Sequence, residues 1–230
     1  MHRDKAALAL ANRILYSKGV VDAFGHVSVR AAQDATRFYL SRNMAPALVT
    51  EQDIVEFDLD GRIIDGSTSK VYLERFIHGS IYRARPDVMS IVHSHSKALI
   101  PFGVTKMRLR PIWHMSGFLA EEVPRFEIRS CAGEESNMLI TSAALGDALA
   151  RSLDKNAVVL MRGHGATIVG PSLQAAVFRA VYAQANAEIQ AAASALGDVV
   201  FLNPAEARNS DAANSGQVDR AWDLWSSEAD

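Results

Sequence analysis

The chain has 230 residues, of which 49% are hydrophobic and 22% charged, and its formal net charge is −2. This profile is typical of a globular protein and argues against a disordered or fibrous chain and against a basic nucleic-acid-binding surface. A single cysteine excludes an intrachain disulfide, and no window holds the roughly 20 apolar residues that cross a membrane, so we expect a cytoplasmic protein without nucleic-acid or membrane partners.

The first quarter of the chain predicts one helix and then a strand-rich region. Apolar residues recur at helical spacing over 8–15, and Gly19 ends the pattern. Asp60-Gly61 is a hairpin signal inside the last of three strand candidates. These candidates lie over 27–30, 38–40 and 54–64.

The middle of the chain predicts a helix and a strand in direct succession. The helix covers about 71–84 and ends before Arg85-Pro86, because the residue before a proline disfavours helical backbone angles. Residues 88–95 have the pattern of a strand. Residues 97–130, which follow, are irregular with short strand candidates.

The second half of the chain predicts a buried strand between two helices. Residues 141–153 form a helix with a Thr or Ser cap, and 157–161 is an uninterrupted apolar run, typical of a central strand buried on both faces. A long alanine-rich helix over 172–196 then stops at Gly197. From about residue 203 the chain is predicted to be a polar tail.

Strands and helices are mixed along the whole chain, with several hairpin-type connections. This pattern predicts a single domain over 1–230 of the α/β class, with three α/β/α layers around a central, mainly antiparallel or mixed sheet. The sequence contains no Gly-x-Gly-x-x-Gly and no Walker motif, which argues against dinucleotide and P-loop chemistry.

Three histidines stand where strands are expected to end. His93 and His95 are two residues apart on one predicted strand, so the period of two places both imidazoles on the same face. His164, between Gly163 and Gly165, follows the buried strand, where the missing side chains expose the imidazole. Three neutral imidazoles suit zinc, manganese or iron and leave coordination positions open. Hydrogen-bonded structural histidines and a plain glycine-rich turn are the alternatives.

Six short motifs follow one another along the chain. Glu74, in the predicted helix, has His78 at the i+4 position on the same side, and taken alone it would be an ordinary helix carboxylate. The motifs are Gly25-x-x-Ser28-x-Arg30, Asp53-Ile54-Val55, Glu74-x-x-x-His78, Arg85-Pro86-Asp87-Val88, Val92-His93-Ser94-His95 and Gly163-His164-Gly165. As a set in this order they resemble the class II aldolase/adducin family over roughly residues 5–200.

The resemblance implies roles for these residues. The histidines matching His93, His95 and His164 would hold a divalent metal, with Mn²⁺ favoured and Zn²⁺ or Fe²⁺ as alternatives, and Glu74 would be an acid/base that can also approach the metal. The family fold is a three-layer α/β/α arrangement, commonly a homotetramer with active sites between subunits. Adducin heads share this fold without the metal ligands, so the complete set here counts against a purely structural interaction module.

Differences from the sugar-phosphate aldolases indicate which branch of the family the sequence resembles. Those enzymes cradle phosphate with Gly-Asn, Thr-Gly and Ser-Ser pairs, whereas the matching places here hold Gly25-His26, the stretch 41–44 and Tyr72-Leu73. Together with residues 111–118, this pattern resembles the branch that decarboxylates hydroxylated aromatic or pyridine carboxylates, which includes hydroxymethylpyridine-dicarboxylate and dihydroxyphthalate decarboxylases. At these motif positions His26 and Arg42 become the expected contacts to a small anionic substrate.

The resemblance therefore predicts a metal-dependent decarboxylase acting on a hydroxylated aromatic or pyridine (di)carboxylate. Glu74 or His114 would protonate the carbon that bears the carboxylate. A class II aldolase that cleaves a hydroxyketone or a sugar-derived substrate through an enediolate would use the same metal site. An adducin-like interaction module and iron-dependent oxygen chemistry on a prenylated aromatic acid are further alternatives.

Overall fold

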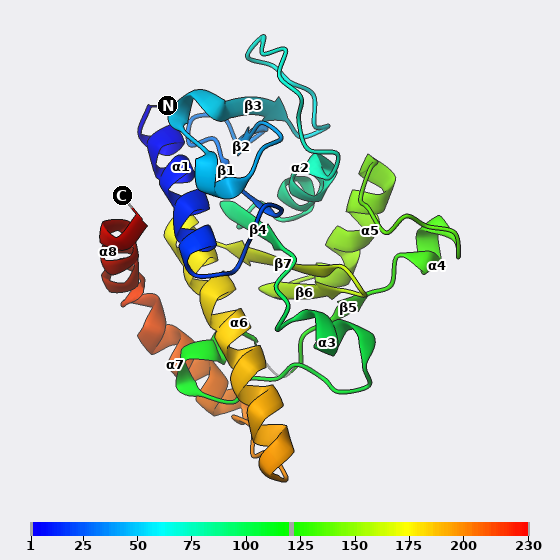
Figure 1. Ribbon diagram of the computed structural model, residues 1–230, viewed down its shortest axis with the longest axis vertical. Helices are drawn as coiled ribbons and strands as arrows, with labels where there is room; N and C mark the ends of the chain where they lie inside the picture. The colour runs from blue at the N-terminus through cyan, green and yellow to red at the C-terminus, as the bar shows by residue number, and fades with distance from the viewer. Residues whose placement is uncertain (1, 120–121, 230) are drawn as a thin grey trace.

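A computed structural model describes residues 2–119 and 122–229. Within them, one seven-stranded sheet has the strand order β3-β2-β1-β4-β7-β6-β5 (Figure 1). Every neighbouring pair is antiparallel except β5 and β6, so the expected mainly antiparallel, mixed sheet is confirmed. The strands are β1 (His26–Arg30), β2 (Arg37–Ser41), β3 (Ile54–Asp58), β4 (Ser90–Ser94), β5 (Arg125–Phe126), β6 (Val158–Met161) and β7 (Gly165–Gly170).

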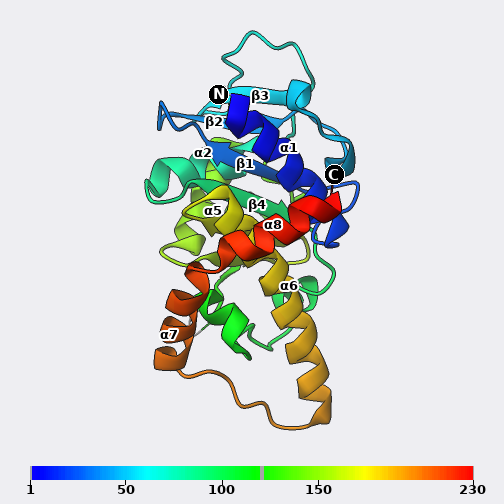
Figure 2. The same ribbon diagram turned by 90° about the vertical axis from the view of Figure 1, so that its left-hand side faces the viewer.

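Helices cover both faces of this sheet, which confirms the α/β/α layers. The first face carries α1 (His2–Ser17), α6 (Leu173–Leu196) and α8 (Val218–Ala229), of which α1 and α8 lie side by side in Figure 2. The opposite face carries α2 (Arg75–Ala84) and α5 (Ala143–Leu153). The remaining elements are α3 (Ile100–Val104), α4 (Arg129–Ala132), α7 (Pro204–Ser215) and the 3₁₀ turns η1 (Pro46–Leu48), η2 (Glu51–Asp53) and η3 (His114–Leu119).

The alternation of side chains along β4 divides the core into two parts. Val92 packs with the side chains of α1 and α6, whereas Ile91 packs with those of α2 and α5. Because side chains two residues apart on a strand share a face, His93 projects on the same side as Ile91, toward α2. The alternation along β4 therefore determines that His93 faces α2.

Three helix starts were expected from the sequence, and the structure agrees with two of them, where a side chain caps the helix. The hydroxyl of Ser142 accepts from the backbone of α5, and that of Ser172 accepts from the backbone of α6, which confirms both predicted starts. The helix expected over 71–84 begins only at Arg75. Tyr72 is held outside it, since its hydroxyl donates to the carbonyl of Met44 at 2.6 Å.

The segment expected as a polar tail forms the helices α7 and α8. Asn203 caps α7 in a reciprocal capping box with Glu206. Trp225 of α8 is only 7% exposed, and its ring centroid lies 6.0 Å from that of Tyr182 on α6. Trp222 and Trp225 give α8 an apolar side, although the average composition of this segment is polar.

Two further differences concern strands. The hairpin expected at Asp60-Gly61 is reduced to an isolated bridge between Phe57 and Ile63, and β7 was not predicted at all. Within the described part of the chain, no helix combines the length and apolarity needed to cross a lipid bilayer.

Candidate active site

Three imidazoles converge where β4 ends. His93 lies in β4, His95 follows it directly, and His164 lies in the turn between β6 and β7. Because β7 runs antiparallel to β4, with Ala166 opposite Ser94, the turn that precedes β7 lies beside the end of β4. The Nε2 atom of His95 is 3.1 Å from that of His93 and 3.0 Å from that of His164.

Glu74, the residue directly before α2, brings a carboxylate to the same point. Its Oε2 lies 3.5 Å from His93 Nε2 and 3.4 Å from His164 Nε2, while its Oε1 accepts a hydrogen bond from the backbone N–H of Ile140 at 2.9 Å. Burial raises the pKa of Glu74, but the two imidazoles and the Ile140 N–H outweigh burial and lower that pKa to about 2. The side chain is therefore a carboxylate at neutral pH.

The four side chains fit a divalent metal ion. Their ligand atoms all lie within 4.8 Å of one another, and two nitrogens bound at right angles about 2.1 Å from one ion would stand about 3.0 Å apart. His164 Nδ1 lies 2.9 Å from the carbonyl oxygen of Met138, so it donates its proton there and leaves a lone pair on Nε2. This is the arrangement in which an outer partner fixes the tautomer of a metal ligand.

His26 joins this group from the neighbouring strand. It is the first residue of β1 and pairs in register with His93. Its ring centroid lies 5.0 Å from that of His93 and 4.6 Å from that of Tyr72. The structure thus brings His26 to the edge of the three metal-ligand candidates.

Arg42 and His114 lie outside the cluster of Glu74 and the three histidines. Arg42 directly follows β2 and pairs through Nε with Asp53 Oδ1 at 2.7 Å, with 44% of its side chain exposed. His114 opens η3 on an exposed surface, and its carbonyl accepts a hydrogen bond from Asn214 of α7 at 2.7 Å. Within the described chain, neither side chain forms a hydrogen bond or ion pair with the four clustered residues.

Several groups that complete the site carried no signal in the sequence. The contacts from Ile140 and Met138 are backbone groups, which side-chain patterns do not reveal. Met138 also has a φ of 69°, uncommon for a residue with a side chain. Ser28 and His78 stand in the sequence motifs without an assigned role, and their side chains lie 2.6 Å apart in the structure.

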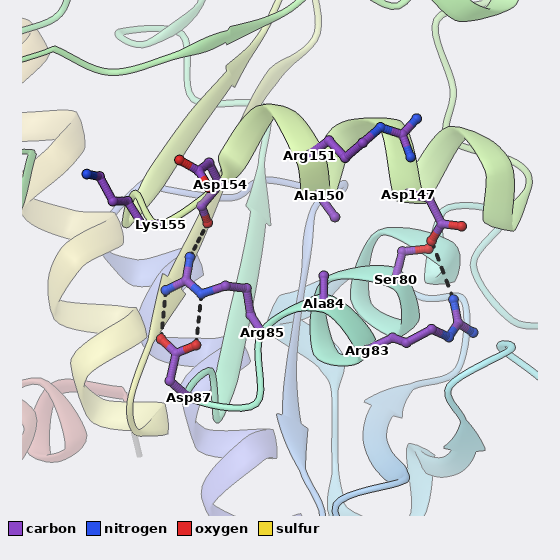
Figure 3. A pocket seen from close by; sticks show the side chains of 10 residues that line it. All are labelled: Ser80, Arg83, Ala84, Arg85, Asp87, Asp147, Ala150, Arg151, Asp154 and Lys155. Atoms are coloured by element: carbon purple, nitrogen blue, oxygen red, sulfur yellow. Dashed lines mark hydrogen bonds and ion pairs between the residues drawn. The ribbon is translucent and has the colours of Figure 1, made fainter.

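Of two surface pockets, one is lined by charged residues away from the candidate active site, and the other includes His95 in its lining. A pocket of about 780 Å³ opens between α2 and α5, where Arg83 pairs with Asp147 at 3.4 Å and Arg85 with Asp87 at 2.7 Å (Figure 3). It lies toward the C-terminal end of α2, the opposite end from Glu74. A second pocket, of about 460 Å³, lies beside α1 and α6 and has His95 among its lining residues.

Gly165 allows β4 and β7 to approach closely at the histidines. A Cβ atom there would lie 2.0 Å from the carbonyl oxygen of Ser94. We expect Gly165→Ala to lower the free energy of unfolding by about 1–3 kcal/mol, the usual cost of overpacking, and to weaken metal binding, because the strand end that carries His95 must move. Gly216→Ala is the matched control, since its nearest atom would be 3.8 Å away. Urea unfolding compares the two, and equal losses would contradict this role of Gly165.

Comparison with known proteins identifies the family. Residues 6–191 match the Class II Aldolase and Adducin N-terminal domain, and the chain belongs to this family, which confirms the resemblance seen in the motifs. Among solved structures, an aldolase II superfamily protein from Pseudomonas syringae shares the fold with a TM-score of 0.81 at 23% identity, over 99% of this chain and 92% of that chain.

Two curated relatives agree with the expected decarboxylase branch. The chain is 39% identical to decarboxylase tropJ of Talaromyces stipitatus, over 92% of this chain and 88% of that protein. It is 28% identical to a 3,4-dihydroxyphthalate decarboxylase of Arthrobacter keyseri, over 88% of this chain and 85% of that protein.

Proposed function

We propose that the protein is a divalent-metal-dependent decarboxylase of a hydroxylated aromatic carboxylate. The observation that carries this proposal is the convergence of three imidazole Nε2 atoms and the Glu74 carboxylate within 4.8 Å, in a chain whose relatives are named as decarboxylases. His93, His95 and His164 would hold the metal, with Mn²⁺ as the favoured ion. When bound, the metal supplies a Lewis acid that stabilises negative charge on a substrate oxygen.

Glu74 is the proposed proton carrier. As a carboxylate it takes a proton from the ring hydroxyl onto Oε2, while Oε1 stays fixed by the Ile140 N–H. It then delivers this proton to the ring carbon that bears the carboxylate, and the carbon–carbon bond to the carboxylate breaks as carbon dioxide leaves. The proton thus takes the place of the lost carboxylate, and the ring recovers its aromaticity. General acid–base transfer of this kind needs a carrier fixed within hydrogen-bond reach.

The substrate contacts complete the proposal. His26 lies at the edge of the cluster and Arg42 at the end of β2, so both are offered to the anionic groups of the substrate. His114 is exposed and outside the cluster of its own chain, and it would reach an active site only across a subunit boundary. A homotetramer with active sites between subunits would provide such a boundary, and the exposed apolar side chains of Phe24 and Leu73 suit it.

A carbon dioxide release assay tests the function directly. Manganese-loaded protein is offered 3,4-dihydroxyphthalate and related hydroxylated aromatic and pyridine dicarboxylates, with sugar phosphates as controls. We expect release from at least one aromatic acid and its abolition by EDTA, because removal of the metal removes the Lewis acid. Aldehyde formation from a sugar phosphate without carbon dioxide release would instead identify an aldolase. The same assay with zinc and ferrous iron ranks the metals.

A further inference from the structure

A chain of buried polar groups leads from His26 away from the metal ligands. His26 Nδ1 lies 2.7 Å from His78 Nε2, and His78 Nδ1 lies 2.6 Å from the hydroxyl of Ser28. The Ser28 hydroxyl lies 2.7 Å from that of Tyr82. Ser28, His78 and Tyr82 are at most 1% exposed, so their protons have no bulk water to bond, whereas His26, 3% exposed, lies at the open end of this chain of groups.

The two hydroxyls determine the direction of these hydrogen bonds. Among the described residues, the side-chain oxygens of Ser28 and Tyr82 contact only each other and His78 Nδ1. Two hydroxyl protons share this group, and only one of them can lie between the two oxygens. The other must be donated to His78 Nδ1, because a buried hydroxyl without an acceptor costs the desolvation of its proton. Tyr82 therefore donates to Ser28, and Ser28 donates to His78.

The direction of these hydrogen bonds determines which nitrogen of each imidazole carries the proton. Because Ser28 donates to His78 Nδ1, that nitrogen holds a lone pair and His78 is neutral, in keeping with burial, which lowers the pKa of His78 to about 3. A neutral imidazole that accepts at Nδ1 carries its proton on Nε2. His78 then donates from Nε2 to His26 Nδ1, and His26 in turn must carry its own proton on Nε2.

We infer that Ser28 and His78 hold His26 in the tautomer that offers an Nε2–H donor to an anionic oxygen of the substrate. No described residue bonds to this Nε2, and the ring stands between Tyr72 and His93 at the edge of the proposed metal site. The ligand class, a carboxylate or an ionised ring hydroxyl, rests on the proposed function. The opposite tautomer would present a lone pair to the same oxygen and repel it. Ser28 and His78 are thus positioning residues that act through His26.

The tautomer can be measured without any turnover. Long-range proton–nitrogen NMR spectra of zinc-loaded protein, labelled with ¹⁵N-histidine, distinguish a protonated Nε2 from a protonated Nδ1, and His26→Gln assigns the signal. We expect the Nε2–H form in the natural protein. A proton on Nδ1 of His26 would overturn the inference outright, whether or not any variant folds.

Two variants separate the hydrogen bond from packing. Ser28→Ala removes the donor to His78 Nδ1, so neither direction is then favoured and His26 should become a mixture of tautomers. Tyr82→Phe removes a neighbouring buried oxygen but leaves Ser28 free to donate, so His26 should keep the Nε2–H form. An unchanged tautomer in Ser28→Ala would also contradict the inference.

Kinetics then connect the tautomer to the substrate. With whichever aromatic acid the assay selects, we expect Ser28→Ala to raise KM on the order of tenfold to a hundredfold, the range for loss of a hydrogen bond to a charged group, with a smaller change in kcat. Ser28→Thr, which restores the hydroxyl, should recover both the tautomer and KM. Absence of carbon dioxide release from every acid would defeat the proposed function, whereas release by a protein with the wrong His26 tautomer would defeat this inference alone.

Discussion

Replacement of His95 by alanine is expected to abolish metal binding and decarboxylation while the chain stays folded. His95 Nε2 is the atom close to both other imidazoles, at 3.1 and 3.0 Å, and the residue follows β4 instead of filling the core. We expect metal affinity to fall by more than about a hundredfold, since even outer partners of a metal site are worth roughly 10- to 100-fold. Elemental analysis of the purified protein measures the metal directly.

Thermal unfolding gives an independent reading of the same variant. Manganese at about 100 times its dissociation constant should stabilise the natural protein by about 2.7 kcal/mol, whereas His95→Ala should gain almost nothing. His114→Ala is the matched control, because it removes an exposed imidazole outside the cluster and should keep its metal. A His95→Ala protein with full metal content would refute the ligand assignment.

Glu74→Gln is expected to keep the metal and lose turnover. Glutamine retains an oxygen for the Ile140 N–H, which Glu74 Oε1 accepts at 2.9 Å, and it preserves the shape of the side chain. It cannot take up and deliver a proton, so kcat should fall by about 10²- to 10⁴-fold. The measurement is kcat on protein whose metal content matches the natural chain.

A matched acidic residue serves as the control for this change. Glu56 lies on β3 and pairs with Arg37 at 3.4 Å, away from the histidines. Glu56→Gln should leave kcat close to its natural value. If Glu74→Gln turned over at a near-normal rate, Glu74 would be excluded as the proton carrier.

Local patterns in the sequence were sufficient for most of the fold but not for β7. The starts of α5 and α6 were predicted because each cap is a single side chain within its own turn. Gly165 and Gly170 bound β7, and a Cβ on Gly170 would lie 2.5 Å from the backbone nitrogen of Ala176. Gly165 is required by the distant Ser94, and Gly170 by the start of the next helix, α6, while glycine itself lowers the local preference for a strand. Tertiary contacts therefore determine this strand.

The candidate site shows the same difference between local patterns, which the sequence reveals, and tertiary contacts, which it does not. The alternation of side chains predicted that His93 and His95 share a face, and the structure brings both together with His164. Motif positions alone predict Arg42 and His114 as site residues, and within one chain neither joins that cluster. Spacing along a chain locates side chains within one element, but it does not show which loops close over the element.

The position of His164 has a consequence for how the protein folds. His95 and His164 are 69 residues apart in the chain, and they meet only after β7 has inserted between β4 and β6. An ion held by both can bind only once the chain between them has closed, because the entropy of closing so long a loop must be overcome before the contact forms. A contact that is absent from the transition state of folding leaves the folding rate almost unchanged and slows unfolding. A bound metal would then lower the rate at which the folded sheet opens.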